Sequence, residues 1–492
     1  MSGDSSCQQW CSFPNSNLKS KILPASNSDE PLEQGSVMDD TRYQRAMEGL
    51  FSRLNYERTP DAATSIADFR LNTIRRLLAA LGNPQSRLPT VHLAGSKGKG
   101  STATMVARIA EAAGYRVGLF TSPHVDRFEE RFTVNGTVPE QRDVADLYDH
   151  LQQVVQKIQK QDAAFLPTFF EMSTAMGWMH FTNQHVDLAV IEVGLGGRLD
   201  STNICNPAVT VITSISRDHT RLLGETLAAI AREKAGIIKP GVPVVTHVTD
   251  PAAARATEEI ARQQGVSQFR LGTEFHCRPH RRKQGHPDLS ANYRFDFQGM
   301  GIDWRDLELG MPGEHQTQNG ALAVATTQLL AGQGWKLPET AVRQGLKNAR
   351  CPLRVEVIHC DPLLIVDVAH NPASIAALCA TIHQMPAQRR LVIFSSSRDK
   401  EAETMLRTLN ETADEIWLTQ FTTNPRAVEL HELKQMAERI LTCPWRIQNT
   451  PATAIAAART WATPRDLICI TGSFFLAAEA KSLLGTEASR PE

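Results

Sequence analysis

Short apolar runs alternate with segments of helical periodicity over residues 90–263 of the chain. The apolar runs predict buried strands, and the segments between them place apolar side chains three or four positions apart, which is typical of helices that cover a sheet. We therefore predict a parallel sheet with helices on both faces. The predicted strands are Val91–Ala94, Val117–Phe120, Leu188–Val193, Val209–Ile212 and Val242–Val245. The predicted helices are Met105–Ala113, Asp143–Ile158, Glu171–Phe181, Leu227–Ile237 and Ala252–Gln263.

A second alternation of the same kind begins after Cys351. It predicts another, smaller α/β domain, so the fold class is α/β with a larger sheet domain at 41–348 and a smaller Rossmann-like domain at 349–492. The predicted strands are Leu363–Val366, Leu391–Phe394, Glu415–Leu418 and Leu467–Ile470. The predicted helices are Ala373–Ile382, Ala402–Leu409, Leu430–Ile440 and Ala452–Thr460.

Three stretches depart from this rhythm. Residues 1–40 are polar with few large apolar side chains, so we predict a disordered tail, within which Met38 is an alternative start. Residues 68–81 predict a helix that stops at Gly82. Residues 271–312 predict a basic loop followed by hairpin strands, and a solvated surface loop is favoured there over a nucleic-acid patch. A helix is expected from Gln316 to Ala331.

Composition narrows the class of protein. With 492 residues, 41% of them hydrophobic and 21% charged, the chain has the make-up of a globular protein of several domains. Its net charge of -1 provides no global field for nucleic acid or anionic membrane, and no apolar run approaches the roughly 20 residues of a membrane span. The nine cysteines form no C-x-x-C pair and their number is odd, which favours a reducing cytoplasm over a disulfide framework.

The clearest chemical motif is the glycine-rich turn between the strand at 91–94 and the helix that follows it. Glycines let backbone amides approach a phosphate chain, and the helix N-terminus adds its dipole. Lys99 is expected at the β- and γ-phosphates and Ser101 at a magnesium ion, although the spacing G-x-x-G-K-G-S departs from the usual P-loop form. A tight turn without a ligand is the alternative. The predicted phosphate-binding residues are Gly95, Ser96, Lys97, Gly98, Lys99, Gly100 and Ser101.

Polar clusters also follow the other predicted strands, at 121–124, 192–203 and 218–219. Ligands of open α/β sheets bind beyond the carboxyl ends of the strands, so these groups are expected to gather beside the phosphate loop. Their carboxylate and hydroxyl oxygens suit a hard cation such as Mg²⁺.

Taken in order, these motifs resemble the folylpolyglutamate synthase family, a branch of the Mur ligases. The resemblance runs from about residue 68 to 476, and the runs Gly196-Gly-Arg-Leu-Asp200 and Arg232-Glu-Lys-Ala-Gly236 favour this branch over the peptidoglycan ligases. The other matching stretches are Gly95–Ser101, Thr121–His124, Phe170-Glu171, Asp218-His219, Gly313–Asn319, Arg354–Glu356, Asp367–Pro372, Asp399-Lys400 and Pro425–Ala427.

The resemblance implies a role for each matching residue. Ser122, Glu192 and His219 would bind magnesium, and Lys234 would be carbamylated to serve a second magnesium; an ordinary helix lysine is the alternative. The catalytic set is Lys99, Lys234 and His370, the last near the phosphates and the incoming glutamate. Asn319, Arg354 and Asp367 would hold adenine, phosphate and ribose, and the folate pocket would be lined by Phe170, Glu171, Arg198 and Asp200.

The chain also departs from the family pattern. Lys97 stands where bacterial members commonly have Asn, and Leu353 and Val368 stand where Gly is usual, which restricts the backbone at two turns. The N-terminal helix reads Asp68-Phe-Arg-Leu-Asn72 instead of the run of many bifunctional members, which puts a dihydropteroate site in doubt.

The implied activity is ATP-dependent addition of L-glutamate to a folate, with dihydropteroate as another acceptor, through an acyl phosphate with release of ADP and phosphate. We expect a monomer with Mg²⁺ and with ATP, L-glutamate and a folate or dihydropteroate as its small-molecule partners, and no nucleic acid or membrane. A P-loop NTPase that drives conformational work is the main alternative. A non-catalytic nucleotide-binding module is disfavoured by the intact Lys99, Glu192 and His219.

Overall fold

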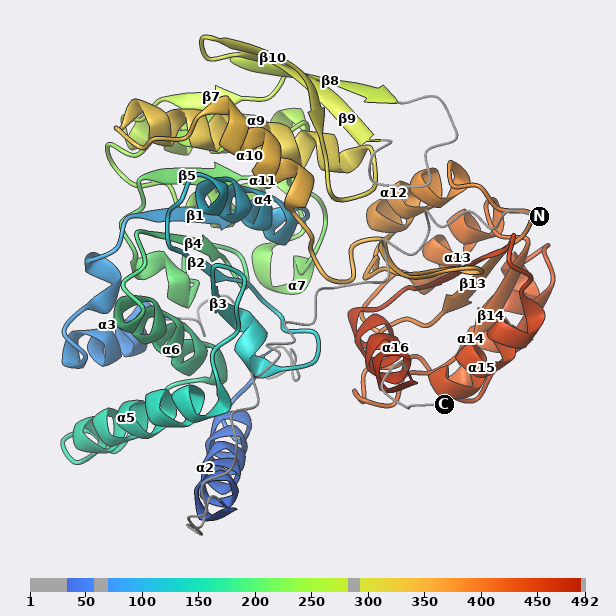
Figure 1. Ribbon diagram of the computed structural model, residues 1–492, viewed down its shortest axis with the longest axis horizontal. Helices are drawn as coiled ribbons and strands as arrows, with labels where there is room; N and C mark the ends of the chain where they lie inside the picture. Colours follow the sequence, from blue (N-terminus) through green and yellow to red (C-terminus); the bar gives the residue numbers. More distant parts are fainter. Residues whose placement is uncertain (1–32, 57–69, 282–292, 488–492) are drawn as a thin grey trace, which may run out of the picture.

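The computed structural model describes residues 33–56, 70–281 and 293–487. Within these ranges the chain forms two α/β units side by side, the first in blue to yellow and the second in orange to red (Figure 1). The predicted α/β class is confirmed. The predicted tail at 1–40 lies mostly outside the described residues, but its last part is wrong because helix α2 (Glu33–Phe51) begins inside it.

The first unit is built on a seven-stranded sheet in the described part of the chain, with the order β3-β2-β4-β1-β5-β6-β7. All neighbours are parallel except β2 and β3. The strands are β1 (Thr90–Ala94), β2 (Val117–Phe120), β3 (Phe132–Val134), β4 (Leu188–Glu192), β5 (Val209–Ile212), β6 (Val244–Thr246) and β7 (Gln268–Arg270).

Helices cover both faces of this sheet because its strands alternate their buried side chains between two cores. Leu188 and Val190 of β4 face a core with α4, α10 and α11, while Ala189 and Ile191 face one with α2, α3, α5 and α6. These helices are α3 (Leu71–Ala80), α4 (Lys99–Ala112), α5 (Gln141–Gln159), α6 (Phe169–Asn183), α10 (His315–Gly332) and α11 (Glu339–Asn348). The remaining helices are α7 (Thr220–Leu223), α8 (Leu227–Ala235) and α9 (Pro251–Gln263).

The stretch predicted as a basic loop is partly a strand. A three-stranded antiparallel sheet of β8 (Phe275–Arg281), β9 (Tyr293–Gly299) and β10 (Ile302–Glu308) packs on α10, so the hairpin prediction is confirmed and the loop prediction fails over 275–281. β8 and β9 share an apolar face that includes the stacked rings of Phe275 and Phe297. Burial of this face stabilises the strand in spite of the polar side chains that suggested a loop. Residues 282–292 of the predicted loop lie outside the described residues.

The second unit has a six-stranded sheet in the described part of the chain, ordered β11-β12-β16-β13-β14-β15 and parallel except at β11. Its strands are β11 (Glu356–Cys360), β12 (Leu363–Val366), β13 (Arg390–Phe394), β14 (Glu415–Leu418), β15 (Trp445–Ile447) and β16 (Leu467–Thr471). One face is covered by α12 (Pro372–His383), α13 (Ala402–Asn410) and α14 (Leu430–Ile440), the other by α15 (Pro451–Trp461) and α16 (Phe474–Glu487).

The link between the two units contains unusual backbone. Leu353 has φ 58° and Val355 has φ 49°, in the left-handed region that favours glycine. Glycine would adopt this conformation without strain, whereas the Leu353 side chain makes it cost about 1–2 kcal/mol of conformational strain. Its side chain is fully buried in the second unit, and that burial offsets the strain. No helix of the described ranges is long and apolar enough to cross a bilayer.

The contact of α11 with α4 generates a prediction about stability. A Cβ atom on Gly345 of α11 would lie 2.4 Å from the Cα atom of Ile109 in α4. Gly345→Ala should lower the free energy of unfolding in urea by about 1–3 kcal/mol, because the helices must separate. Gly332→Ala is the matched control, since nothing lies within 4 Å of its Cβ position at the end of α10. Equal stability of the two variants would contradict the close packing.

Candidate active site

The phosphate loop lies between β1 and α4, at the carboxyl edge of the first sheet. Gly98 occupies the N-cap of α4 with φ 83°, and no side chain caps this helix N-terminus. A Cβ atom on Gly98 would come within 2.4 Å of the amide oxygen of Asn319, so only glycine fits there. The uncapped amides and the helix dipole form a site suited to an anion.

Lysine side chains from both units gather around this loop. The Lys97 ammonium lies 2.9 Å from Asp218 Oδ2 and 2.9 Å from His370 Nε2 of the second unit. Lys400 of the second unit donates to Asp218 Oδ1 at 3.1 Å. Asp218 is therefore shared by two cations that reach it from different domains.

Two further ammonium groups converge on a single backbone carbonyl of the loop. Lys234 Nζ donates to Gly95 O at 2.9 Å and Lys99 Nζ donates to the same oxygen at 3.2 Å. Lys99 also lies 3.7 Å from Glu192 Oε1. We call Lys97, Lys99, Lys234 and Lys400 the lysine cluster. Its four cations exceed the two carboxylates beside them, Asp218 and Glu192, and this imbalance is suited to binding a polyanion.

The cluster shifts the ionisation of its members. Burial, with the neighbouring Lys99 charge adding to it, lowers the pKa of Lys234 to about 7. Burial also lowers the pKa of Lys97 to about 8, although Asp218 opposes that change. Burial alone would raise the pKa of Asp218, but Lys97, His219 and Lys400 outweigh it and hold that pKa well below its usual range.

His370 is held in one protonation state. Burial, followed by the charge of Lys97, lowers the pKa of its imidazole well below its usual value. Its Nδ1 lies 2.7 Å from the carbonyl oxygen of Val368, which can only accept, so Nδ1 carries the proton. Nε2 therefore presents a lone pair to the Lys97 ammonium, and His370 is a neutral hydrogen-bond acceptor at the domain interface.

The residues predicted to bind magnesium are only partly brought together. The backbone amide of Ser122 donates to Glu192 Oε2 at 3.4 Å, so these two strand ends meet beside the phosphate loop. His219 lies instead 3.8 Å from Asp218 Oδ1. No group of three His, Cys, Asp or Glu side chains in the described ranges forms a metal cage. Few protein donors suit Mg²⁺, which keeps several waters and shares phosphate oxygens, so Glu192 and Ser122 fit this ion.

Of the three residues predicted to hold the rest of the nucleotide, Asn319 lies against the phosphate loop, Arg354 lies between α11 and β11, and Asp367 follows β12. Asn319 contacts Gly98 and donates to Gln316, whose amide reaches Ser101 Oγ at 3.4 Å. Asp367 accepts the backbone amides of Val355 and Ala369 and is buried. Arg354 lies close enough that its charge opposes the burial that raises the pKa values of Glu192 and Asp367. Their roles toward adenine, phosphate and ribose stay predictions.

The predicted folate residues make mostly internal bonds. Phe170 lies under Gly194, where a Cβ atom would approach its ring to 2.4 Å. Glu171 completes the capping box of α6 with Thr168. Arg198 forms an ion pair of 2.9 Å with Glu233. Asp200 accepts hydrogen bonds inside its own loop. Their role toward a folate stays a prediction.

Asp218 and Lys400 join the two units at this site. The sequence placed Asp218 beside the phosphate loop only as part of a polar cluster suited to a cation, and it assigned no role to Lys400. Both were visible as polar residues shortly after predicted strands, at Asp218-His219 and Asp399-Lys400. What the sequence could not supply was their partnership across the domain interface, because it depends on how the two sheets face each other.

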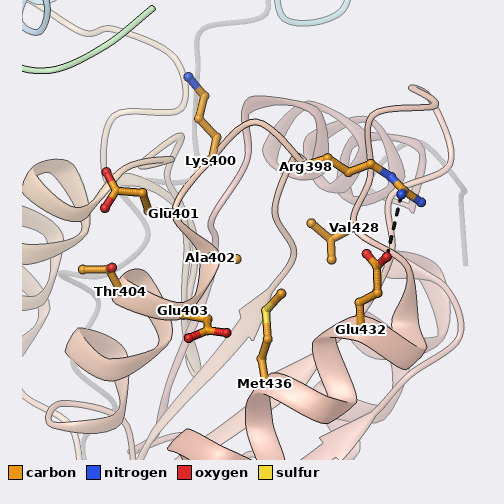
Figure 2. Close-up of a pocket in the computed structure, with 9 residues that line it drawn as sticks. All are labelled: Arg398, Lys400, Glu401, Ala402, Glu403, Thr404, Val428, Glu432 and Met436. Carbon is orange, nitrogen blue, oxygen red and sulfur yellow. Dashed lines mark ion pairs between the residues drawn. The ribbon is translucent and has the colours of Figure 1, made fainter. Parts of the chain in front are cut away.

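A pocket in the second unit lies between the segment at 398–404 and α14 (Figure 2). Its cation Arg398 is neutralised, because it pairs with Glu429 at 3.0 Å and with Glu432 at 3.8 Å. Lys400 points away from the other labelled side chains (Figure 2), and its amine bonds to Asp218. The unbalanced positive charge is therefore at the domain interface and not in this pocket. The lining residues are Arg398, Lys400, Glu401, Ala402, Glu403, Thr404, Val428, Glu432 and Met436.

Comparison with known proteins places this geometry in a class. Residues 93–327 match the Mur ligase middle domain and residues 353–474 match the Mur ligase glutamate ligase domain. The chain is 35% identical to the folylpolyglutamate synthase of Lacticaseibacillus casei over 84% of this chain and 93% of that protein. It is 32% identical to the dihydrofolate synthase/folylpolyglutamate synthase of Bacillus subtilis, over 90% of this chain and 99% of that one.

The structural comparison agrees with the sequence comparison. The folylpolyglutamate synthase of Mycobacterium tuberculosis in complex with ADP superposes with a TM-score of 0.81 at 30% identity, over 92% of this chain and 100% of that one. The two domains thus define a Mur ligase. Within that class, the chain belongs to the folylpolyglutamate synthase/dihydrofolate synthase family, which confirms the resemblance inferred from its motifs.

The buried Lys234 generates a prediction about stability and pH. The pKa of Lys234 falls from 10.5 in the unfolded chain to about 7 in the folded protein. Its burial therefore lowers the free energy of unfolding by the full amount below pH 7, and this destabilisation disappears as the pH rises to about 10. In CO₂-depleted buffer, Lys234→Met should raise the free energy of unfolding near pH 6 by roughly 3 kcal/mol, after the loss of the bond to Gly95. The gain should shrink steadily towards pH 10.

The control for this prediction is Lys347→Met, because Lys347 is 61% exposed and pairs only loosely with Glu308. Urea unfolding of both variants across this pH range measures the effect. A destabilised Lys234→Met, or a gain that does not vary with pH, would mean that Lys234 is not a strained buried cation.

Proposed function

We propose that this protein uses ATP to convert a folate carboxylate into an acyl phosphate and then joins it to the amine of L-glutamate. Family membership makes it an ATP-dependent folate–glutamate ligase. The observation that carries the proposal is the lysine cluster, which brings cations from both domains to one phosphate loop.

In the first step a carboxylate oxygen of the folate attacks the γ-phosphorus of ATP, and ADP leaves. Phosphoryl transfer depends mainly on positioning and charge stabilisation, which the loop amides and Lys99 supply beside the uncapped end of α4. Mg²⁺ held by Glu192 and Ser122 would neutralise charge on the phosphate oxygens. Asn319 at the loop, with Arg354 and Asp367, would orient the nucleotide.

In the second step the amine of L-glutamate attacks the acyl carbon, and phosphate leaves. An amine attacks only after its ammonium form has lost a proton, so the step needs an acceptor. A ligand that displaces Lys97 would uncover the lone pair on His370 Nε2 and remove a charge that lowers the pKa of this imidazole, so His370 would then be able to receive that proton. Closure of the two units around the site would exclude the water that hydrolyses an acyl phosphate.

Lys234 is proposed to act as a carbamate. Its lowered pKa leaves much of the amine neutral at physiological pH, and a neutral amine adds to CO₂ to form a carbamate with loss of one proton. The three other lysines of the cluster outnumber the two carboxylates beside them, which favours a modification that turns the positive charge of Lys234 into a negative one. The carbamate oxygens would provide ligands for a second Mg²⁺ near Gly95.

The acceptor is proposed to be a reduced folate monoglutamate, with dihydropteroate as a second acceptor. The relatives include both a folylpolyglutamate synthase and a dihydrofolate synthase/folylpolyglutamate synthase. We further propose that the protein acts as a monomer in the cytoplasm. The competing function, a P-loop NTPase that performs conformational work, is disfavoured because His370 and Lys400 of the second domain complete the site.

The proposal is tested by incubating the purified protein with ATP, Mg²⁺, L-glutamate and each acceptor in turn, followed by mass analysis. A ligase gives a glutamylated product, with repeated turnover of ATP to ADP only when both the acceptor and L-glutamate are present. ADP formation that is independent of L-glutamate would favour the NTPase. Which acceptors gain glutamate decides whether the enzyme has one activity or two.

The phosphate loop yields a specific prediction for Lys99→Ala. One lost electrostatic donor costs about 3–4 kcal/mol of transition-state stabilisation, so kcat should fall several hundredfold. Folding should change little, because alanine is well tolerated at a helix start and the loss of the partly buried Lys99 relieves the crowding of ammonium groups. Lys336→Ala, a lysine in the segment between α10 and α11, is the control and should keep wild-type turnover. Wild-type turnover of Lys99→Ala would refute the phosphate-loop assignment.

A further inference from the structure

We propose that the loop at 194–203 positions Lys234, and that Asn203 is the residue through which it does so. The inference rests on the proposed role of Lys234. Lys234 lies in the last turn of α8, and its amine must reach Gly95 across the gap between that helix and the phosphate loop. A short helix is held by its packing, so something must fix the rotation and height of its last turn.

Asn203 ties the loop to the end of this helix. Its Nδ2 donates to the carbonyl oxygen of Arg198 at 2.9 Å and to that of Gly236 at 3.1 Å. Gly236 is the C-cap of α8, so Asn203 satisfies a carbonyl that the helix itself leaves unpaired. The Asn203 side chain is buried, and a buried carbonyl left without a donor costs about 1–3 kcal/mol.

The loop backbone lies directly against the same turn. The amide of Arg198 donates to the carbonyl oxygen of Glu233 at 2.8 Å. A Cβ atom on Gly197 would lie 2.8 Å from Lys234 O and 2.9 Å from Glu233 O, so glycine permits this approach. Arg198 and Glu233 also form an ion pair, but the Arg198 side chain is 48% exposed. Exposed ion pairs of this kind add little to the stability of a fold.

The loop is in turn anchored to the strand that carries the phosphate loop. Asp200 accepts hydrogen bonds from the amides of Leu195 and Thr202 and from Thr202 Oγ1, which fixes the shape of the loop. Thr202 Oγ1 lies 2.9 Å from Nε2 of His92 in β1. Gly95 follows the end of the same strand.

β1 and α8 are thus connected in two ways. His92 of β1 contacts Thr202, whose neighbour Asn203 bonds to the end of α8. Lys234 of α8 bonds back to Gly95, the residue after β1. These bonds fix the end of α8 relative to the phosphate loop, so the flexible Lys234 side chain starts from a fixed position. Reacting groups placed by rigid neighbours act far more effectively than mobile ones.

The test compares the wild type with Asn203→Ala in ¹³C-labelled bicarbonate. Lys234→Arg identifies the carbamate resonance because it cannot give one. Asn203→Ala should reduce the occupancy of the carbamate severalfold at fixed bicarbonate and raise the bicarbonate concentration for half-maximal turnover by a similar factor. Thr450→Ala is the matched control, since it removes an N-cap of α15 in the second unit and should leave both quantities unchanged.

A second measurement separates this inference from the proposed modification. Trace labelling with acetic anhydride, followed by mass spectrometry across pH, reports the reactivity of the Lys234 amine without any carbamate. Asn203→Ala should make Lys234 more reactive than in the wild type or in Thr450→Ala. If the wild type forms no carbamate, the proposed modification of Lys234 is wrong, but the positioning role of Asn203 is still tested by the labelling. Unchanged labelling, or unchanged carbamate occupancy in a carbamylated wild type, would overturn the positioning role of Asn203.

Discussion

The constraint on which the site depends is the crowding of ammonium groups in a partly buried space that has too few carboxylates. Lys97, Lys99, Lys234 and Lys400 share Asp218 and Glu192 as their acidic neighbours. Burial lowers the pKa values of Lys97 and Lys234, and the neighbouring ammonium charges lower them further, so holding these cations in place has a free-energy cost in the ligand-free protein. An arriving polyphosphate relieves it, so part of the affinity for nucleotide is stored in the folded protein.

The scaffold makes this crowding tolerable. The phosphate loop follows a central strand flanked on both sides by parallel neighbours, so its backbone is fixed before any ligand binds. The second domain supplies Lys400 and His370 from segments that follow the ends of its own strands. The two sheets therefore present their carboxyl edges to one shared site, and the strained residues Leu353 and Val355 lie in the segment that joins them.

Much of this could be predicted from the sequence. Buried strands and amphipathic helices have strong periodicity, so the strand at 209–212 and the helix at 227–237 differ from the observed elements by at most two residues. Short edge strands such as β7 and β15 were missed because three residues carry little pattern. Strand β8 was misjudged because its basic side chains outweighed an apolar face that only its partner strand reveals.

The site divides in the same way. Residues within one motif, such as Gly95–Ser101, could be placed together from local sequence, since a strand, a turn and a helix fix their relation. The bonds from Lys97 to His370 and from Lys400 to Asp218 join positions separated by 273 and 182 residues, so they depend on domain packing that no local pattern encodes. Asn203 was recognised only as part of a motif, because its side-chain amide donates to backbone carbonyl groups, and no sequence pattern reveals such bonds.

The central claim is that one anion site is built from both domains. Hydrogen–deuterium exchange in the presence of Mg²⁺ and a non-hydrolysable ATP analogue tests it most directly, because it reports both domains in one experiment. The account predicts slower exchange in the phosphate loop at 95–101 together with the segments at 367–371 and 398–400 of the second domain. Protection confined to the first domain would contradict it.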